Sequence, residues 1–244
     1  GLKKTINSVM NQTWQEFEYL IIDGGSTDGS IDYIESHNEF IDYWESEPDK
    51  GVYHAMNKGI KNAKGEYLLF INSGDHFYDK FVLEKNYKLM NQDDIIYSNL
   101  QVVYNTKTFI KDYPEKLSFS YFVKDTLPHP ATFIKKEAFI QTNFYNEDFK
   151  IASDWKFFID GVCKFNLKCK KVDTVFSTFY LGGMSSNPEN RSIKHKEIQQ
   201  VLRNDYSAYI RDIEDILINN EVIMNLRKSR IIKLLIKLGF LNKF

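Results

Sequence analysis

The residues best suited to chemistry lie where apolar runs of the sequence end. The run 17–22 ends at Asp23, which is followed by Gly24 and Gly25. Glycines at a strand end let the backbone approach a ligand, and a helix that starts just after them favours a phosphate or another polar group. The same residues are also typical of an ordinary turn with a helix cap. They match neither the dinucleotide-binding glycine pattern nor the phosphate-binding loop with its lysine.

A second apolar run, 66–71, leads into Asn72, Ser73 and Asp75. A carboxylate beyond a buried strand can hold a divalent metal ion, which can bridge a diphosphate and stabilise a departing nucleotide. Taken alone, the letters Asn-Ser-Gly-Asp are also typical of a turn. The segment therefore predicts either a turn or a metal site built on Asp75.

Two further residues could act on a hydroxyl group. Asp154 opens a predicted helix, 154–164, and an acid in the first turn of a helix is stabilised by the helix dipole. If that turn faces a cleft, the carboxylate could accept the proton of an incoming hydroxyl. His129 lies between Pro128 and Pro130, which predicts a rigid loop that carries either an exposed histidine or a histidine of the site.

These residues can lie close together only if the strands that they follow end at the same edge of a sheet. Up to about residue 100, strands and helices alternate in the manner of parallel β-α-β units. Ligands of such sheets bind beyond the carboxyl ends of the strands, where Asp23 and Asp75 both lie. The predicted strands are 17–22, 40–45, 66–71, 95–104 and 170–179, and the predicted helices are 1–13, about 28–37, 53–65, 80–90, 154–164 and a helical tail from Glu189.

Composition excludes several classes of function. The 244 residues carry a formal net charge of −1, which gives no overall case for nucleic-acid binding. The two cysteines indicate neither a disulfide framework nor a zinc site. We find no signal peptide and no apolar run long enough to span a membrane, so we expect a cytoplasmic protein.

Charge is unevenly distributed along the chain. Between residues 14 and 50 there are eleven acids and one base, whereas six bases and no acid follow Glu221. The last predicted helix, 226–241, has bases on one side and aliphatic residues on another. It could lie on an anionic membrane at the inner face of the cell membrane, or pack on its own domain or on a second subunit of a homo-oligomer.

Taken in order, the motifs resemble one known family. The chain is similar to family 2 glycosyltransferases of the GT-A fold over about residues 1–185, and the matching segments are 8–13, 18–30, 46–53, 55–59, 65–75, 129–133, 153–154 and 182–185. The resemblance implies an α/β fold with a Rossmann-like, mostly parallel central sheet flanked by helices. It implies a catalytic domain of residues 1–186, a helical extension of residues 187–244, and a first strand of the family that is absent from the sequence.

The resemblance also implies an activity. A sugar would move from a nucleotide diphosphate sugar to a hydroxyl acceptor, a glycan or a lipid-linked molecule, with inversion at the anomeric carbon. Asp154 would be the general base, and Asp75 would bind Mn²⁺ or Mg²⁺ as the last residue of the D-x-D motif. Residues that would contact substrates are Asp23, Gly24, Gly25, Asp49, Lys50, Asn72, Ser73, Gly183 and, on the acceptor side, His129.

Three positions depart from the family pattern. Ser73 replaces the first aspartate of D-x-D, so metal binding would depend on the diphosphate or on a later ligand such as His195. Gly24 stands where many relatives have an aspartate that binds the base, and His54 where close relatives carry aspartate. Two alternatives stay open: a non-catalytic nucleotide- or sugar-binding protein of the same fold, and a nucleotidyltransferase, although residues 24–30 contain no basic side chain to bind a triphosphate.

Overall fold

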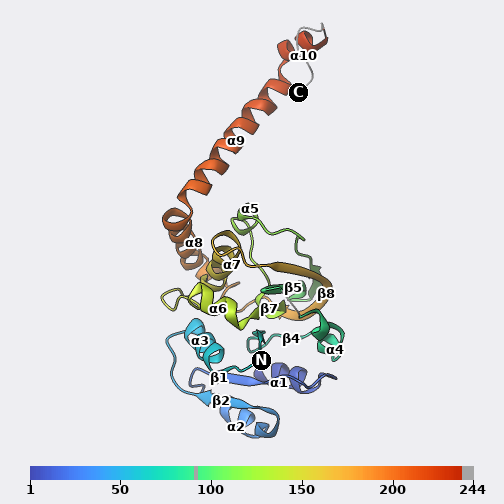
Figure 1. Ribbon diagram of the computed structural model, residues 1–244, viewed down its shortest axis with the longest axis vertical. Coiled ribbons are helices and arrows are strands. Elements are labelled where there is room, and N and C mark those ends of the chain that lie inside the picture. The colour runs from blue at the N-terminus through green and yellow to red at the C-terminus, as the bar shows by residue number, and fades with distance from the viewer. Residues whose placement is uncertain (91–92, 238–244) are drawn as a thin grey trace. The chain divides into compact units, whose positions relative to one another are not determined.

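The structure is a computed structural model that describes residues 1–90 and 93–237 (Figure 1). The chain forms two compact units, residues 1–198 and residues 199–244. The first unit contains both sheets. Helix α8 (Arg191–Asp205) begins in the first unit and continues into the second.

Helices and strands alternate through the first part of the chain, as the sequence predicts. In order, the elements are α1 (Leu2–Met10), β1 (Leu20–Asp23), α2 (Ser30–Glu35), β2 (Tyr43–Ser46), α3 (Val52–Asn62), β3 (Tyr67–Leu68), β4 (His76–Phe77) and α4 (Val82–Asn86). They are followed by β5 (Ile95–Tyr104), β6 (Lys107–Lys111), α5 (Phe119–Phe122), β7 (Thr132–Lys135), α6 (Lys136–Thr142), α7 (Ser153–Cys163) and β8 (Cys169–Tyr180). The predicted strand 66–71 is therefore the most shortened element.

Strands β1 and β2 form a parallel pair of their own. Because parallel strands end at the same edge, Asp23 at the end of β1 pairs with Ser46 at the end of β2. Helices α1 and α2 pack on this pair through a buried cluster of aliphatic side chains, namely Ile6, Ile21, Ile34 and Ile41. The cluster holds these helices against the strand pair that ends at Asp23 and Ser46.

The second sheet is mixed. Its strand order is β3-β7-β5-β8-β4, with β6 paired to β5. Strands β5 and β8 are parallel, whereas the pairs β3–β7, β5–β7, β4–β8 and β5–β6 are antiparallel. The α/β fold with helices flanking a central sheet is confirmed, but the sheet is less parallel than expected. The strands β5 and β6 show the reason, because a connection as short as theirs can only join antiparallel neighbours.

The second unit is helical in the part that the structure describes. Helix α8 ends at Asp205 and is followed by α9 (Ser207–Lys228) and α10 (Arg230–Lys237). The predicted helix 226–241 is thus interrupted at Ser229, and its residues 238–241 lie outside the described residues. No helix within residues 1–90 and 93–237 is long and apolar enough to cross a membrane.

Candidate active site

Asp23 is held at the end of β1 by four hydrogen bonds. The backbone N–H groups of Gly25 and Ser26 donate to its Oδ2 over 3.0 and 2.8 Å, and the Ser26 hydroxyl donates to its Oδ1 over 2.6 Å. The Ser46 hydroxyl, from β2, donates to Oδ2 over 2.6 Å. Burial raises the pKa of Asp23, but the hydrogen bonds to the ionised form outweigh burial and hold this pKa below its ordinary value. Asp23 therefore anchors the turn after β1 as a carboxylate.

Gly24 lies close to the side chain of Asp49, in the loop that follows β2. A Cβ atom at Gly24 would lie 2.6 Å from Asp49 Oδ2, which is far inside van der Waals contact. Asp49 is itself fixed, because its Oδ1 accepts the N–H of Gly51 over 2.8 Å. Gly25 has a φ of +85°, in the left-handed region that favours glycine. The structure thus brings the Asp-Gly-Gly turn and Asp49 together, and their role in donor binding stays a prediction.

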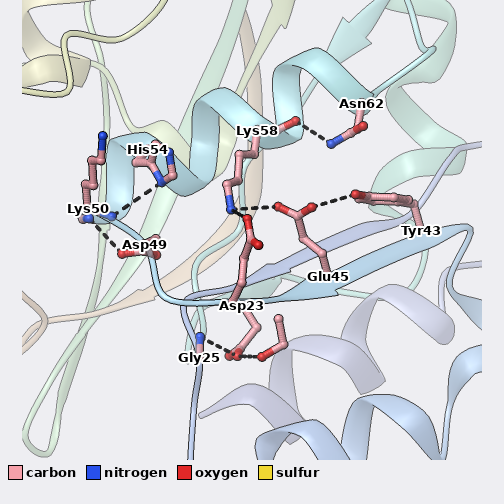
Figure 2. A network of polar contacts seen from close by, with 12 residues as sticks. Asp23, Gly25, Tyr43, Glu45, Asp49, Lys50, His54, Lys58 and Asn62 are labelled. Carbon is pink, nitrogen blue, oxygen red and sulfur yellow. Dashed lines mark hydrogen bonds and ion pairs between the residues drawn. The ribbon is translucent and has the colours of Figure 1, made fainter.

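Lys58 ties α3 to β2 next to this turn (Figure 2). Its Nζ forms ion pairs with Glu45, at 3.2 Å, and with Glu47, and the Tyr43 hydroxyl donates to Glu45 Oε2 over 2.7 Å. Lys50 lies at the start of α3, where its N–H is 3.5 Å from Nδ1 of His54. Sequence reasoning missed the Lys58 network. A sequence signal exists, because Glu45 and Glu47 are two residues apart, the spacing that puts side chains on one face of an extended segment, and two acids on one face favour a basic partner.

Asp75 lies directly before β4 and is 5% exposed. The N–H of Tyr180, in β8, donates to Asp75 Oδ1 over 3.1 Å, and the Thr5 hydroxyl donates to the Asp75 carbonyl oxygen over 2.7 Å. Burial raises the pKa of Asp75 to about 6, although the bond from Tyr180 opposes this rise. A cation beside this carboxylate would favour its ionised form.

The other predicted residues of this segment are exposed. Asn72 and Ser73 lie at the surface, and Asn72 accepts the Asp75 N–H over 3.0 Å at its carbonyl oxygen. Gly183 is exposed in the turn after β8, where its carbonyl oxygen accepts the N–H of Ser186 over 3.1 Å. Asn72 and Ser73 precede Asp75 in sequence, and Gly183 follows the strand whose Tyr180 binds Asp75. The contact of these three residues with substrate stays a prediction.

The carboxylate of Asp75 suits a divalent cation, but few protein ligands accompany it. His195 lies exposed on α8. In the part of the chain that the structure describes, no group of three or more His, Cys, Asp or Glu side chains is arranged to hold a metal ion. A role of Asp75 in binding Mn²⁺ or Mg²⁺ stays a prediction, in which oxygen atoms of a donor diphosphate and of water would complete the ligand set.

Asp154 lies in the first turn of α7 and is half-buried. The hydroxyl of Tyr53, on α3, lies 2.8 Å from Asp154 Oδ1 and 2.6 Å from the carbonyl oxygen of Ile151. Burial, and then the charge of Asp154, raise the pKa of Tyr53, so this hydroxyl keeps its proton and acts as a donor. One phenol hydrogen serves both acceptors, which ties the carboxylate to the backbone just before α7.

His129 is buried, with 7% of its surface exposed, and is not an exposed loop histidine. The two prolines place it in a 3₁₀ turn, His129–Ala131, where its ring stacks on Phe70 at a centroid distance of 5.0 Å. Its Nε2 lies 2.7 Å from the Tyr145 hydroxyl. Burial lowers the pKa of His129, and the charge of Asp154 only partly opposes this effect. The imidazole is thus a neutral partner of Tyr145.

Two of the predicted residues, Asp154 and His129, belong to one group of contacts at the start of α3. Tyr53 follows the Asp49–Lys50 loop within one helical turn and contacts Asp154. Its ring lies 5.6 Å from that of Tyr145, which contacts His129. Phe70, which stacks on His129, stands at the beginning of the segment that leads to Asp75. Contacts therefore link the candidate base to His129 and Phe70, whereas the Asp49–Lys50 loop and Asp75 are connected to this group through the chain.

Known proteins resemble this chain in sequence. Residues 1–152 match the family described as Glycosyl transferase family 2. An uncharacterized glycosyltransferase of Mycobacterium tuberculosis is 30% identical over 201 residues, which cover 79% of this chain and 75% of that protein. A PGL/p-HBAD biosynthesis glycosyltransferase of Mycobacterium bovis is 27% identical over 193 residues, which cover 76% of this chain and 74% of that protein.

Solved structures resemble it in fold. Staphylococcus aureus TarS, residues 1–349 in complex with UDP, superposes with a TM-score of 0.58 at 16% identity and covers 84% of this chain and 69% of that chain. The same protein in complex with UDP-GlcNAc gives a TM-score of 0.57 at 19% identity, over 73% of this chain and 54% of that chain. These structures show the GT-A fold, and the match over residues 1–152 shows that the chain belongs to glycosyltransferase family 2.

Proposed function

We propose that the protein is an inverting glycosyltransferase that moves a sugar from a nucleotide diphosphate sugar to a hydroxyl acceptor. The observation that carries the proposal is the half-buried Asp154 carboxylate, held by Tyr53 at the start of α7, in a chain of family 2. TarS has been solved with UDP and with UDP-GlcNAc, which makes a UDP-sugar the first donor to test.

Asp154 is the general base in this proposal. Its carboxylate takes the proton of the acceptor hydroxyl while the acceptor oxygen bonds to the anomeric carbon. The bond between that carbon and the diphosphate breaks, and the diphosphate leaves with the electron pair. Tyr53 holds Oδ1 of the base through its hydroxyl, so the carboxylate meets the acceptor in one orientation.

In this proposal both backbone groups and charged side chains bind the nucleotide diphosphate sugar. The turn at residues 23–25 and the neighbouring Asp49 would border the nucleoside, and Lys50 would approach the diphosphate. Asp75 would hold Mn²⁺ or Mg²⁺ together with diphosphate oxygens, and the bound ion supplies charge stabilisation to the leaving group. The raised pKa of Asp75, about 6, supports this role, because a buried carboxylate without a cation is poorly stabilised.

A donor panel tests the activity. Turnover with UDP-, GDP- and dTDP-sugars is measured with Mn²⁺ and with a chelator, for the wild type and for Asp154→Asn. We expect product with one donor class and a loss of at least about 100-fold in Asp154→Asn, which is the usual contribution of a general base. Asp148→Asn, which alters an exposed carboxylate of the preceding loop, is the matched control.

Two outcomes would count against the proposal. A folded Asp154→Asn variant with near wild-type turnover would show that another group is the base. Nucleotide binding without turnover of any donor would favour a non-catalytic binding protein of the same fold.

We further propose that the acceptor is lipid-linked and that α10 contacts the inner face of the cell membrane. Ile231 and Leu234, one turn apart on α10, are 71% and 55% exposed, and Lys233 and Lys237 are exposed on the same helix. Exposed aliphatic and basic side chains on one helix suit an anionic lipid surface.

Co-sedimentation with vesicles of phosphatidylglycerol, compared with phosphatidylcholine, tests this contact. Ile231→Glu combined with Leu234→Glu should abolish binding to the anionic vesicles. Ile140→Glu, at an isoleucine of α6 that is 62% exposed, should not. Equal sedimentation of all three proteins would contradict the membrane contact, and a concentration-dependent dimer that the double variant loses would assign α10 to a second subunit.

A further inference from the structure

Glu197, on α8, accepts hydrogen bonds from three consecutive backbone N–H groups. The N–H of Lys150 donates to its Oε1 over 2.7 Å, and those of Ile151 and Ala152 donate to its Oε2 over 3.0 and 2.9 Å. Glu197 and residues 150–152 all belong to the first compact unit. Hydrogen bonds to an ionised acceptor are about twice as strong as neutral ones, so this carboxylate fixes the segment firmly.

The segment that Glu197 binds leads directly into α7. The residue that caps this helix, Ala152, has no side chain that could accept a hydrogen bond from the N–H groups at the helix start. Glu197, on a different helix and more than forty residues further along the chain, binds the N–H of Ala152 and those of the two residues before it. The first turn of α7, which carries Asp154, therefore begins from a backbone position that Glu197 sets.

Tyr53 binds one of the same residues, Ile151, at its carbonyl oxygen. Ile151 donates its N–H to Glu197 and accepts the Tyr53 hydroxyl at its carbonyl oxygen. The Tyr53 hydroxyl is also the group that contacts Asp154 Oδ1. One continuous path of hydrogen bonds thus runs from the Glu197 carboxylate through a single residue, Ile151, and Tyr53 to the candidate base.

We propose that Glu197 is a positioning residue for glycosyl transfer: it holds residues 150–152 so that Tyr53 and Asp154 keep their mutual geometry. This inference rests on the role proposed for Asp154. Glu197 does not contact the reacting groups itself, and it lies beyond the residues that match the family. Its loss should therefore lower kcat and leave the KM for the donor unchanged.

Glu197→Gln is the informative change, because it keeps the size of the side chain while replacing one carboxylate oxygen with an N–H₂ group that faces N–H donors. We expect amide exchange at residues 150–152 to become faster, and kcat to fall on the order of 10- to 100-fold, the scale on which a small misplacement of a catalytic group acts. Glu189→Gln, which makes the same charge change at an exposed residue of the neighbouring turn, should alter neither quantity.

A double-mutant cycle separates positioning from general stabilisation. If Glu197 acts through Asp154, then Glu197→Gln should cause no further loss of turnover in the Asp154→Asn background, with the UDP-, GDP- and dTDP-sugar panel as donors. Unchanged amide exchange at residues 150–152 would overturn the inference, with or without turnover data. Equal fractional losses of turnover from Glu197→Gln in the wild-type and Asp154→Asn backgrounds would also overturn it. The same holds if Glu197→Gln leaves kcat unchanged while Asp154→Asn is inactive. Full activity of Asp154→Asn would instead refute the proposed base.

Discussion

Asp75 allows a prediction that needs no substrate. In the folded protein burial raises the pKa of this carboxyl to about 6, whereas in the unfolded chain the pKa stays near 3.8. A group of this kind stabilises the fold fully below the lower of these pKa values. Its contribution to the free energy of unfolding is lost as the pH rises through the higher one.

The size of the effect follows from the two pKa values. The pKa rises from 3.8 to about 6, and each pKa unit corresponds to ~1.4 kcal/mol, so ionisation of Asp75 destabilises the fold by at most about 3 kcal/mol at neutral pH. Asn in place of Asp75 keeps an oxygen for the N–H of Tyr180 and carries no charge. Asp75→Asn should therefore exceed the wild type in stability by up to about 3 kcal/mol near pH 8, and this difference should vanish toward pH 4.

Urea unfolding of both proteins in chelator, at about pH 4, pH 6 and pH 8, measures this difference. Asp148→Asn, at an exposed carboxylate, is the control and should follow the wild type. Parallel pH curves for Asp75→Asn and the wild type would refute the reasoning, because they would mean that Asp75 ionises as easily in the fold as outside it. Mn²⁺ with UDP should then stabilise the wild type and not Asp75→Asn near pH 8, and equal stabilisation of both would contradict a metal role for Asp75.

Three further predictions concern the remainder of the site. Gly24→Ala puts a Cβ 2.6 Å from Asp49 Oδ2, so it should displace the Asp49 side chain and raise the KM of the donor by about tenfold, or ~1.4 kcal/mol, in steady-state kinetics. Tyr53→Phe removes a buried hydroxyl with two acceptors and should cost about 1–3 kcal/mol in urea unfolding as well as lower kcat, while Tyr43→Phe should keep kcat. His129 has a pKa lowered by burial from its ordinary value of 6.5, so its contribution to stability is present above that pH and lost on acidification. His129→Gln should flatten this loss of unfolding free energy as the pH falls below 6.5.

Local pattern was enough to predict much of the fold. The alternation of apolar strands and amphipathic helices up to residue 100 placed α1 to α4, because period and turn residues are local signals. The helix predicted at 154–164 matches α7, Ser153–Cys163, for the same reason. The pairing of strands was less predictable, since the direction of neighbours depends on connections and not on the composition of each strand.

The site was predictable as a set of residues and less so as a set of contacts. Asp23, Gly24 and Asp49 come together as expected of one edge of a sheet. The burial of His129 depends on Phe70 and Tyr145, which lie far from it in sequence or in another element, so no local pattern indicates it. Tyr53 and Glu197 were missed because their partners, Asp154 and residues 150–152, are reached only when distant helices pack.

The position of Glu197 has a practical consequence for recombining this chain with its relatives. The sequence suggests a natural joint at residue 187. A chimera that exchanges the C-terminal helices there would replace Glu197, which binds the segment before α7, with the residue that the relative carries at this position. A crossover after Ile198, the last residue of the first compact unit, keeps that carboxylate and exchanges the remaining helices. Chimeras made at the two joints would therefore differ in catalysis wherever the other chain carries a different residue at position 197.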